Sequence, residues 1–351
     1  LLIIGLLALI GAMSVPARAE EPFRRTIREG VGVEWTEELI HYRLEFAPGE
    51  LSGDPAFDVT VDGELVPAQV ADVARYADGS LRACNVWFFV SLPAGGAMDV
   101  EVAPGQGKPV TGVEVREQQD AIELLTNGPD PVGIRLPAGG EEYVWPADAA
   151  DVPGPIQKLR LPSGNWIGRG NLEVPFTVKS FESTVTERGP LFAEAHVQYT
   201  FDTGSWTFTA RVIKDHPIVI IREELDTGWN EQDSEEIDRF YSFILNGGDF
   251  SPEQVFYTGR TSDGFHGLLK KAPQPEIEAV SHQPTASSGT LVSGYPLSFG
   301  EERTDYYLIG WPCWSSRVGV AVRFHEPGGD AVGFVAMDTP SWLNQMSLRF
   351  K

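Results

Sequence analysis

Residues 191–213 read LFAEAHVQYTFDTGSWTFTARVI. Apolar and polar side chains alternate along Leu191–Phe201 and again along Trp206–Ile213. Alternation of this kind puts every second side chain on one face, which is the pattern of a half-buried β-strand. Between the two runs, Asp202-Thr203-Gly204-Ser205 supplies the residue types of a tight turn. The stretch therefore predicts an antiparallel β-hairpin.

Short alternating runs bounded by Gly, Pro, Asn and Asp recur on both sides of this hairpin, whereas helical periodicity is almost absent. The early runs compose a compact barrel-like domain over residues 36–105, which ends at the Gly/Pro-rich residues 104–107. The longer runs that follow predict a large antiparallel β-sandwich over residues 110–351. We therefore expect an all-β chain, with a small N-terminal barrel-like domain followed by a large antiparallel β-sandwich. The expected strands are 39–46, 57–61, 65–70, 80–89, 98–102, 113–117, 121–125, 176–182, 191–201, 206–213, 218–224, 240–245, 291–292, 306–309, 318–324 and 332–337.

Composition excludes some classes of protein. Hydrophobic residues make up 42% of the chain and aromatic residues 11%, which is well above the content of a disordered chain. The formal net charge is −23, from 50 acidic and 27 basic residues. A field of that sign repels nucleic acid and anionic lipid, so neither is expected as a partner. The same field fits poorly with an acidic polysaccharide.

The first residues resemble part of a secretory signal peptide. Residues 1–11 are an uncharged apolar run, and Ala17-Arg18-Ala19 offers small residues at a cleavage site. The run is shorter than the roughly 20 residues that span a bilayer, so we expect cleavage after Ala19 and no membrane span afterwards. The signal lacks its basic beginning, and the chain stops at Lys351 inside an alternating run. We therefore expect a secreted or periplasmic protein that continues beyond both ends of this chain.

Two cysteines, Cys84 and Cys313, are present. An oxidising compartment would permit one disulfide between them, but their spacing alone does not decide it. The favoured interpretation is two buried free thiols.

Several segments together resemble a known family. Val66-Pro67-Ala68-Gln69-Val70 is followed by the turn Ala77-Asp78-Gly79-Ser80-Leu81-Arg82 and then by Val86-Trp87-Phe88. This order resembles the N-terminal RIFT-related barrel of the exo-acting rhamnogalacturonan lyase-like family. Further along, Glu187-Arg188-Gly189-Pro190-Leu191 resembles the start of the central β-sandwich of that family. The resemblance covers the barrel and the sandwich but not the third domain of the family, an α/α toroid.

The resemblance implies a polysaccharide lyase that acts by β-elimination on a uronate-containing glycan. It also implies that this fragment alone is inactive, because the toroid would complete the cleft. Two alternatives stay open, since a fold does not specify a function. One is a non-catalytic carbohydrate-binding or structural β-sandwich module. The other is a glycoside hydrolase, which would need two carboxylates facing a cleft.

A lyase needs a base, usually Tyr, His or Lys, to remove the proton next to the uronate carboxylate. The weak candidates are His266, His216 and Tyr306. His266 is expected in a loop, and His216 in the turn Lys214-Asp215-His216-Pro217. For both histidines a purely structural role is the favoured alternative.

An aromatic cluster is the stronger signal for a glycan, because indole faces stack on sugar rings. Trp311 and Trp314 flank Pro312, with Arg317 placed to meet a uronate carboxylate. The alternative is that both tryptophans fill the sandwich core. The other substrate-binding candidates are Tyr307 and, in a second group expected on loops, Trp145, Trp166 and Arg169.

An acidic stretch after residue 225 has the oxygen ligands that calcium prefers. Its candidate ligands are Asp226, Asp233 and Glu235. The fixed spacing of a calcium-binding loop is missing, so a solvated acidic loop is the favoured interpretation. Calcium is the one cofactor that the sequence suggests.

Overall fold

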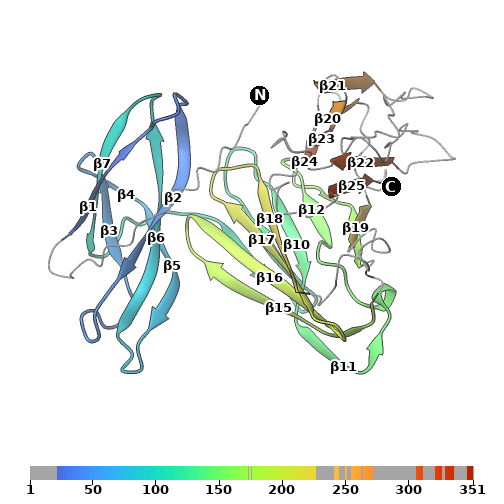
Figure 1. Cartoon of the computed structure of the whole chain (residues 1–351), viewed down its shortest axis with the longest axis horizontal. Coiled ribbons are helices and arrows are strands. Elements are labelled where there is room, and N and C mark those ends of the chain that lie inside the picture. Colours follow the sequence, from blue (N-terminus) through green and yellow to red (C-terminus); the bar gives the residue numbers. More distant parts are fainter. Residues whose placement is uncertain are drawn as a thin grey trace. The chain divides into compact units, whose positions relative to one another are not determined.

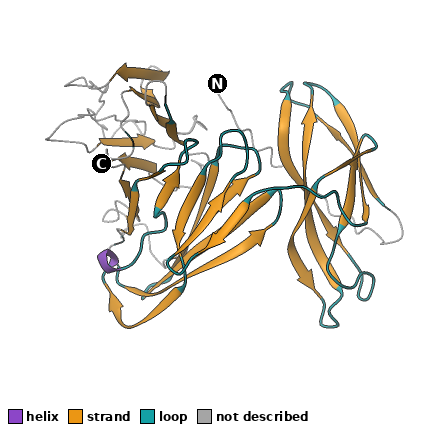
Figure 2. Cartoon of the chain, turned by 180° about the vertical axis from the view of Figure 1, so that it is seen from behind, coloured by secondary structure: helices purple, strands orange, loops and turns teal. Residues whose placement is uncertain are grey.

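The structure is a computed structural model, and the described part of the chain is nearly all β-strand, which confirms the predicted all-β class (Figure 1). The helical structure in these residues is one 3-10 turn, η1 (Ala149–Asp151), drawn purple in Figure 2. No helix in this part of the chain has the length and apolar character needed to cross a bilayer. The structure describes residues 22–172, 174, 176–226, 241–244, 250, 254–261, 264–271, 306–310, 321–325, 329–335 and 346–350.

The chain divides into two compact units. The first comprises the residues up to Val113 together with the segment Glu187–Phe192. The second comprises Glu114–Thr186 and the residues from Ala193 onward.

The first unit contains two antiparallel sheets with a shared hydrophobic core. The four-stranded sheet has the order β1 (Phe23–Arg28), β7 (Ala97–Pro104), β3 (Phe57–Val61) and β4 (Glu64–Val66). The three-stranded sheet has the order β2 (Trp35–Glu45), β6 (Leu81–Leu92) and β5 (Ala68–Arg75). Alternate residues of the long strand β6 are buried, among them Val86 and Phe88. Strand β1 was not predicted, and the expected strand 65–70 is divided at Pro67 into β4 and β5, because proline has no N–H for the ladder.

The Asp78-Gly79-Ser80 turn is held by its own side chains. Asp78 Oδ1 accepts hydrogen bonds from Ser80 N at 2.9 Å and from Ser80 Oγ at 2.6 Å. These bonds favour the charged carboxylate and lower the pKa of Asp78. Gly79 has φ = 85°, a conformation that suits glycine. The residue types of this turn therefore serve its geometry.

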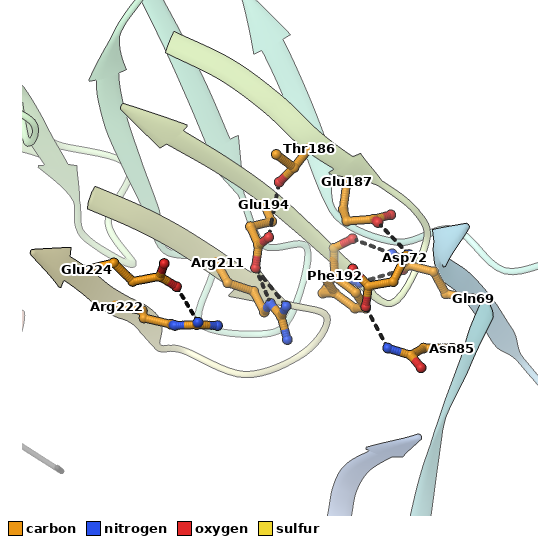
Figure 3. Close-up of polar contacts among 10 residues, drawn as sticks. All are labelled: Gln69, Asp72, Asn85, Thr186, Glu187, Phe192, Glu194, Arg211, Arg222 and Glu224. Carbon is orange, nitrogen blue, oxygen red and sulfur yellow. Dashed lines mark hydrogen bonds and ion pairs between the residues drawn. The ribbon is translucent and has the colours of Figure 1, made fainter. Parts of the chain in front are cut away.

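Gln69 joins two of the segments that the sequence singled out. Its side chain is 3% exposed, and Oε1 accepts a hydrogen bond from Leu191 N at 2.9 Å. Oε1 also accepts from Phe192 N at 2.9 Å (Figure 3). Its Nε2 donates to Phe192 O at 3.1 Å. A Cβ atom at Gly189 would collide with this side chain, so glycine is required there. These bonds explain why Glu187–Phe192 belongs to the first unit, although neighbouring residues belong to the second.

The second unit contains two five-stranded antiparallel sheets. One has the order β13 (Trp166–Ile167), β12 (Lys158–Arg160), β10 (Gly133–Pro137), β9 (Ala121–Leu125) and β8 (Glu114–Glu117). The other has the order β11 (Gly140–Ala147), β15 (Val178–Arg188), β16 (Phe192–Phe201), β17 (Ser205–Ile213) and β18 (Val219–Asp226). Strand β17 packs against β9. The remaining strands are β14 (Arg169–Leu172) with β19 (Tyr241–Ile244), β20 (Gln254–Thr261) with β21 (Gly264–Lys271), β23 (Ala321–His325) and β24 (Ala331–Val335), and β22 (Tyr306–Gly310) with β25 (Met346–Phe350).

The predicted hairpin is confirmed as β16 and β17, which are neighbours in their sheet. Phe201 N donates to Gly204 O at 2.8 Å and closes the turn. Trp206 and Phe208 are fully buried, whereas Thr207 and Thr209 are partly exposed. Alternation therefore correctly indicated which face of β17 lies in the core.

Cys84 is a free thiol and is fully buried in the core of the first unit. Burial raises its pKa to about 12, because a thiolate would lose its hydration there. The thiol is therefore unreactive at neutral pH. Cys313 lies outside the described residues.

Candidate functional site

The structure describes only part of the predicted aromatic cluster. Trp311, Trp314 and Arg317 lie outside the described residues. Tyr306 and Tyr307 lie in β22, where their backbones pair with Phe350 and Arg349 of β25. The role predicted for the two tryptophans stays a prediction.

The predicted metal ligands are likewise mostly outside the described residues, since Asp233 and Glu235 are not among them. Asp226 is the last residue of β18, where it is exposed and pairs with Ser205. Across the described ranges, His, Cys, Asp and Glu side chains form no group of three or more that could hold a metal ion.

Several residues expected in loops lie in strands instead. His266 is in β21, paired with Gly259 of β20; the glycines around it suggested a turn but are accommodated in the ladder. Trp166 is in β13, partly buried and paired with Arg160, and Arg169 begins β14. Strands β13 and β14 have only two and four residues, too few for alternation to reveal them. The structure assigns Trp166 and Arg169 to different sheets.

His216 follows the turn between β17 and β18, as the sequence predicted. Its backbone N donates to Ile213 O at 3.2 Å. The preceding Asp215 has φ = 60°, in the left-handed region, and forms an ion pair with Lys214. This local network supports a role in the turn.

The feature that best fits a binding site is a bulge in the edge strand β11. Glu142 pairs with Ser180 of β15, but the next paired residue of β11 is Ala147, opposite Val178. Residues 143–146 therefore stand opposite Lys179 alone. Pro146 has no N–H for the ladder, which is compatible with a bulge at a sheet edge. The bulge leaves Val144 91% exposed and Trp145 83% exposed.

Tyr143 begins this bulge, and two acidic groups act on it. Its pKa is raised, first by burial, then by the negative charge of Glu141 and a hydrogen bond to it, and then by the charge of Asp151. Tyr143 also acts electrostatically on Tyr199, whose hydroxyl donates to Pro153 O at 2.8 Å. The Tyr143 phenol is therefore neutral at physiological pH, and its hydroxyl group is hydrogen-bonded to Glu141.

A cavity of about 370 Å³ adjoins this cluster. Asp151, which acts electrostatically on Tyr143, is also one of its lining residues. Gln157 and Asn171, which carry amide side chains, are also lining residues. Gln157 Nε2 donates to Gly154 O at 2.9 Å, and Asn171 forms a backbone bridge to Pro153. The side chains and backbone of the cavity wall are thus held in place.

The charge around the bulge is negative. Its acidic residues in sequence are Glu141, Glu142, Asp148 and Asp151. Lys179, the basic residue opposite the bulge, is paired with Asp202 at 2.8 Å. The site therefore combines an exposed indole, a neutral phenol, carboxylates and amides.

The sequence drew attention to Trp145 only as a weaker candidate, and it indicated nothing about Tyr143, Glu141 or Asp151. The Trp145-Pro146 pair was the one available signal, because a proline beside an aromatic residue is typical of a stiff, surface-exposed segment. The grouping of Tyr143 with Asp151 depends on the course of the chain through η1.

No family model matches the chain, and no curated protein matches it. Among solved structures, the chain is similar to that of a protein in the glycosyl hydrolase family 38 from Enterococcus faecalis, with a TM-score of 0.41 and 8% identity. The alignment covers 93% of this chain and 44% of that chain, so this chain spans less than half of its length. A likeness at this level does not indicate a shared activity.

Proposed function

We propose that the second unit of this chain is a glycan-binding β-sandwich module. The observation that supports the proposal most is the 83% exposure of Trp145 on the β11 bulge. A large indole left in water gains by stacking on the apolar face of a sugar ring. Pro146 restricts the backbone next to it, which lowers the entropy lost when the ring is immobilised.

The neighbouring polar groups complement an aromatic platform. Sugar hydroxyls donate to carboxylates such as Glu141 and Asp151, and they accept from amide groups. Gln157 and Asn171 line the adjoining cavity. Stacking and hydrogen bonding together provide both affinity and orientation.

The described site supports binding better than it supports catalysis. A tyrosine that acts as the base of a lyase needs a pKa near the working pH. The pKa of Tyr143 is shifted in the opposite direction, by burial and by two carboxylates. The phenol is therefore suited to hydrogen bonding.

The lyase activity suggested by the family resemblance remains a proposal for a longer protein. Export through the signal sequence in residues 1–19 is a proposal of the same kind, and intact mass of the secreted product tests it. We expect residues 20–351 to show no turnover of uronate-containing polysaccharides. The test is ultraviolet absorbance of the unsaturated product, and its appearance with the purified fragment would contradict the expectation.

The glycan-binding proposal is tested by Trp145→Ala in a screen of immobilised glycans followed by solution titration. We expect the variant to lose about fivefold or more in affinity for glycans that the unaltered chain binds. The control is Val31→Ala, which shortens another exposed apolar side chain, 64% exposed, in the first unit. Glycan binding that is equal in all three proteins would contradict the proposal.

A further inference from the structure

We infer that the β11 site selects uncharged glycans and discriminates against uronates. This inference rests on the proposed glycan-binding function. It concerns the charge of the sugar, which the position of Trp145 does not decide. It also differs from the uronate substrate that the family resemblance implies.

The carboxylates around Tyr143 are the first reason. Glu141 and Asp151 both raise the pKa of this phenol, so their negative charges are felt at its hydroxyl group. A uronate carboxylate in the same place would meet the same charges and would be repelled. A neutral sugar presents a hydroxymethyl group there instead, and its hydroxyl donates to a carboxylate.

The positions of the basic residues are the second reason. The cavity lining contains Asp151 but no lysine or arginine. Lys179, opposite the bulge, is held by Asp202 at 2.8 Å. Arg169 immediately precedes the wall residue Gly170 but is not itself a lining residue. Within the described site, the cavity lining therefore offers a uronate no cation, and the basic residue opposite the bulge is already paired with a carboxylate.

The neutral state of Tyr143 is the third reason. Because the Tyr143 hydroxyl is already hydrogen-bonded to Glu141, its oxygen is left to accept from a sugar hydroxyl, which an ionised uronate carboxylate cannot supply. With Trp145 stacked on the ring face, hydroxyls at the ring edge would meet the carboxylates and amides. Carboxylates accept strong hydrogen bonds from hydroxyl groups, so the acidic rim favours a polyhydroxylated, uncharged ligand.

The experiment compares matched oligosaccharides that differ only at C6. Neutral β-1,4-linked glucose, mannose and galactose oligomers and their C6-oxidised counterparts are titrated against the chain by calorimetry at low ionic strength. We expect the oxidised member of the pair to bind at least about fivefold more weakly. Added salt should reduce the difference, because it screens partly exposed charges.

Two variants separate the possible causes. In Glu141→Gln combined with Asp151→Asn, we expect the preference for the neutral sugar to fall to about twofold or less, because the repelling charges are gone. In the control Arg169→Gln, the preference should not change. Uronate binding that is lost in Arg169→Gln would instead identify a cationic subsite and overturn the inference.

The outcomes also distinguish this inference from the proposed function. Trp145-dependent binding of oxidised oligomers, as tight as or tighter than that of neutral ones, would overturn the uncharged-glycan inference and leave glycan binding intact. A panel in which no oligomer binds in a Trp145-dependent way would overturn the proposed function, and the inference with it.

Discussion

Trp206 and Trp145 belong to the same sheet of the second unit but have opposite environments. Trp206 lies in β17, which has a neighbouring strand on both sides, and its side chain is 0% exposed. It stacks on Tyr199 with ring centroids 5.3 Å apart. Trp145 lies in the edge strand β11 and is 83% exposed.

The register of each strand explains the difference. Strand β17 pairs with β18 without a shift from Ser205 to Val212, so alternate side chains face the core in turn. Strand β11 loses its register between Glu142 and Ala147, and the alternation is lost with it. The same residue type is therefore a core residue in one strand and a ligand-facing candidate in the other.

The largest loss of stability is expected for Trp206→Ala. Removal of a fully buried indole leaves a cavity and should lower the free energy of unfolding by about 3–5 kcal/mol. Chemical denaturation followed by fluorescence or circular dichroism measures it. A loss below about 1 kcal/mol would mean that the core of this sheet collapses around the vacancy, and the contrast with Trp145 would disappear.

The next largest effect is a pH dependence of stability that comes from Glu223, the partner of Phe208 across the β17–β18 pair. Burial raises its pKa to about 7, although a hydrogen bond with Trp206 opposes the shift. Because the folded pKa exceeds the ordinary value of 4.5, the folded state binds more protons between these values. The contribution of the Glu223 carboxyl to stability should therefore be fully present below pH 4.5. It should be lost as pH rises through 7, by at most about 3 kcal/mol.

Glu223→Gln isolates this contribution from those of other acids. The amide keeps the shape of the side chain and removes its titration. We expect the variant to gain stability relative to the unaltered chain as pH rises from 4.5 to 8, measured as the difference between the two unfolding curves. A difference that does not vary with pH would show that the Glu223 carboxyl is hydrated.

A smaller loss of stability is expected when the ion pair between Glu194 of β16 and Arg211 of β17 is removed. Glu194 accepts from Arg211 Nε at 2.8 Å and from Thr186 Oγ1 at 3.0 Å (Figure 3). The partly buried pair should contribute about 1 kcal/mol, so Glu194→Ala should lower stability by that amount. The more exposed Glu224, paired with Arg222, serves as the control, and Glu224→Ala should change stability by less than about 0.5 kcal/mol. Equal losses in the two variants would contradict the dependence on burial.

The smallest effect on stability is expected for Trp145→Ala. Since the indole is 83% exposed, its removal should change the free energy of unfolding by no more than about 0.5 kcal/mol. The measurement is the same denaturation curve as for Trp206→Ala. A loss of several kcal/mol would show that the ring is packed, and it would end the role of Trp145 as a free platform.

The predictability of the fold differed from one element to another. The β16–β17 hairpin was predictable because its alternation and its Asp202–Ser205 turn are both local in sequence. The short strands β12, β13 and β14 were missed because two to four residues do not establish a period. The candidate site was less predictable still, since Trp145 was assigned to a loop and Tyr143 was not considered.

The amino-acid sequence by itself determined the all-β class, the hairpin and the acidic character of the chain, because these depend on neighbouring residues and on composition. The tertiary structure decided which tryptophan is buried, since the exposure of Trp145 depends on a register shift against β15. It also decided that Gln69 binds the backbone of Leu191 and Phe192, and that Asp151 acts on Tyr143. Burial, hydrogen bonding and electrostatic interaction depend on distance in space, and distance in space between residues far apart in sequence is specified only when the chain folds.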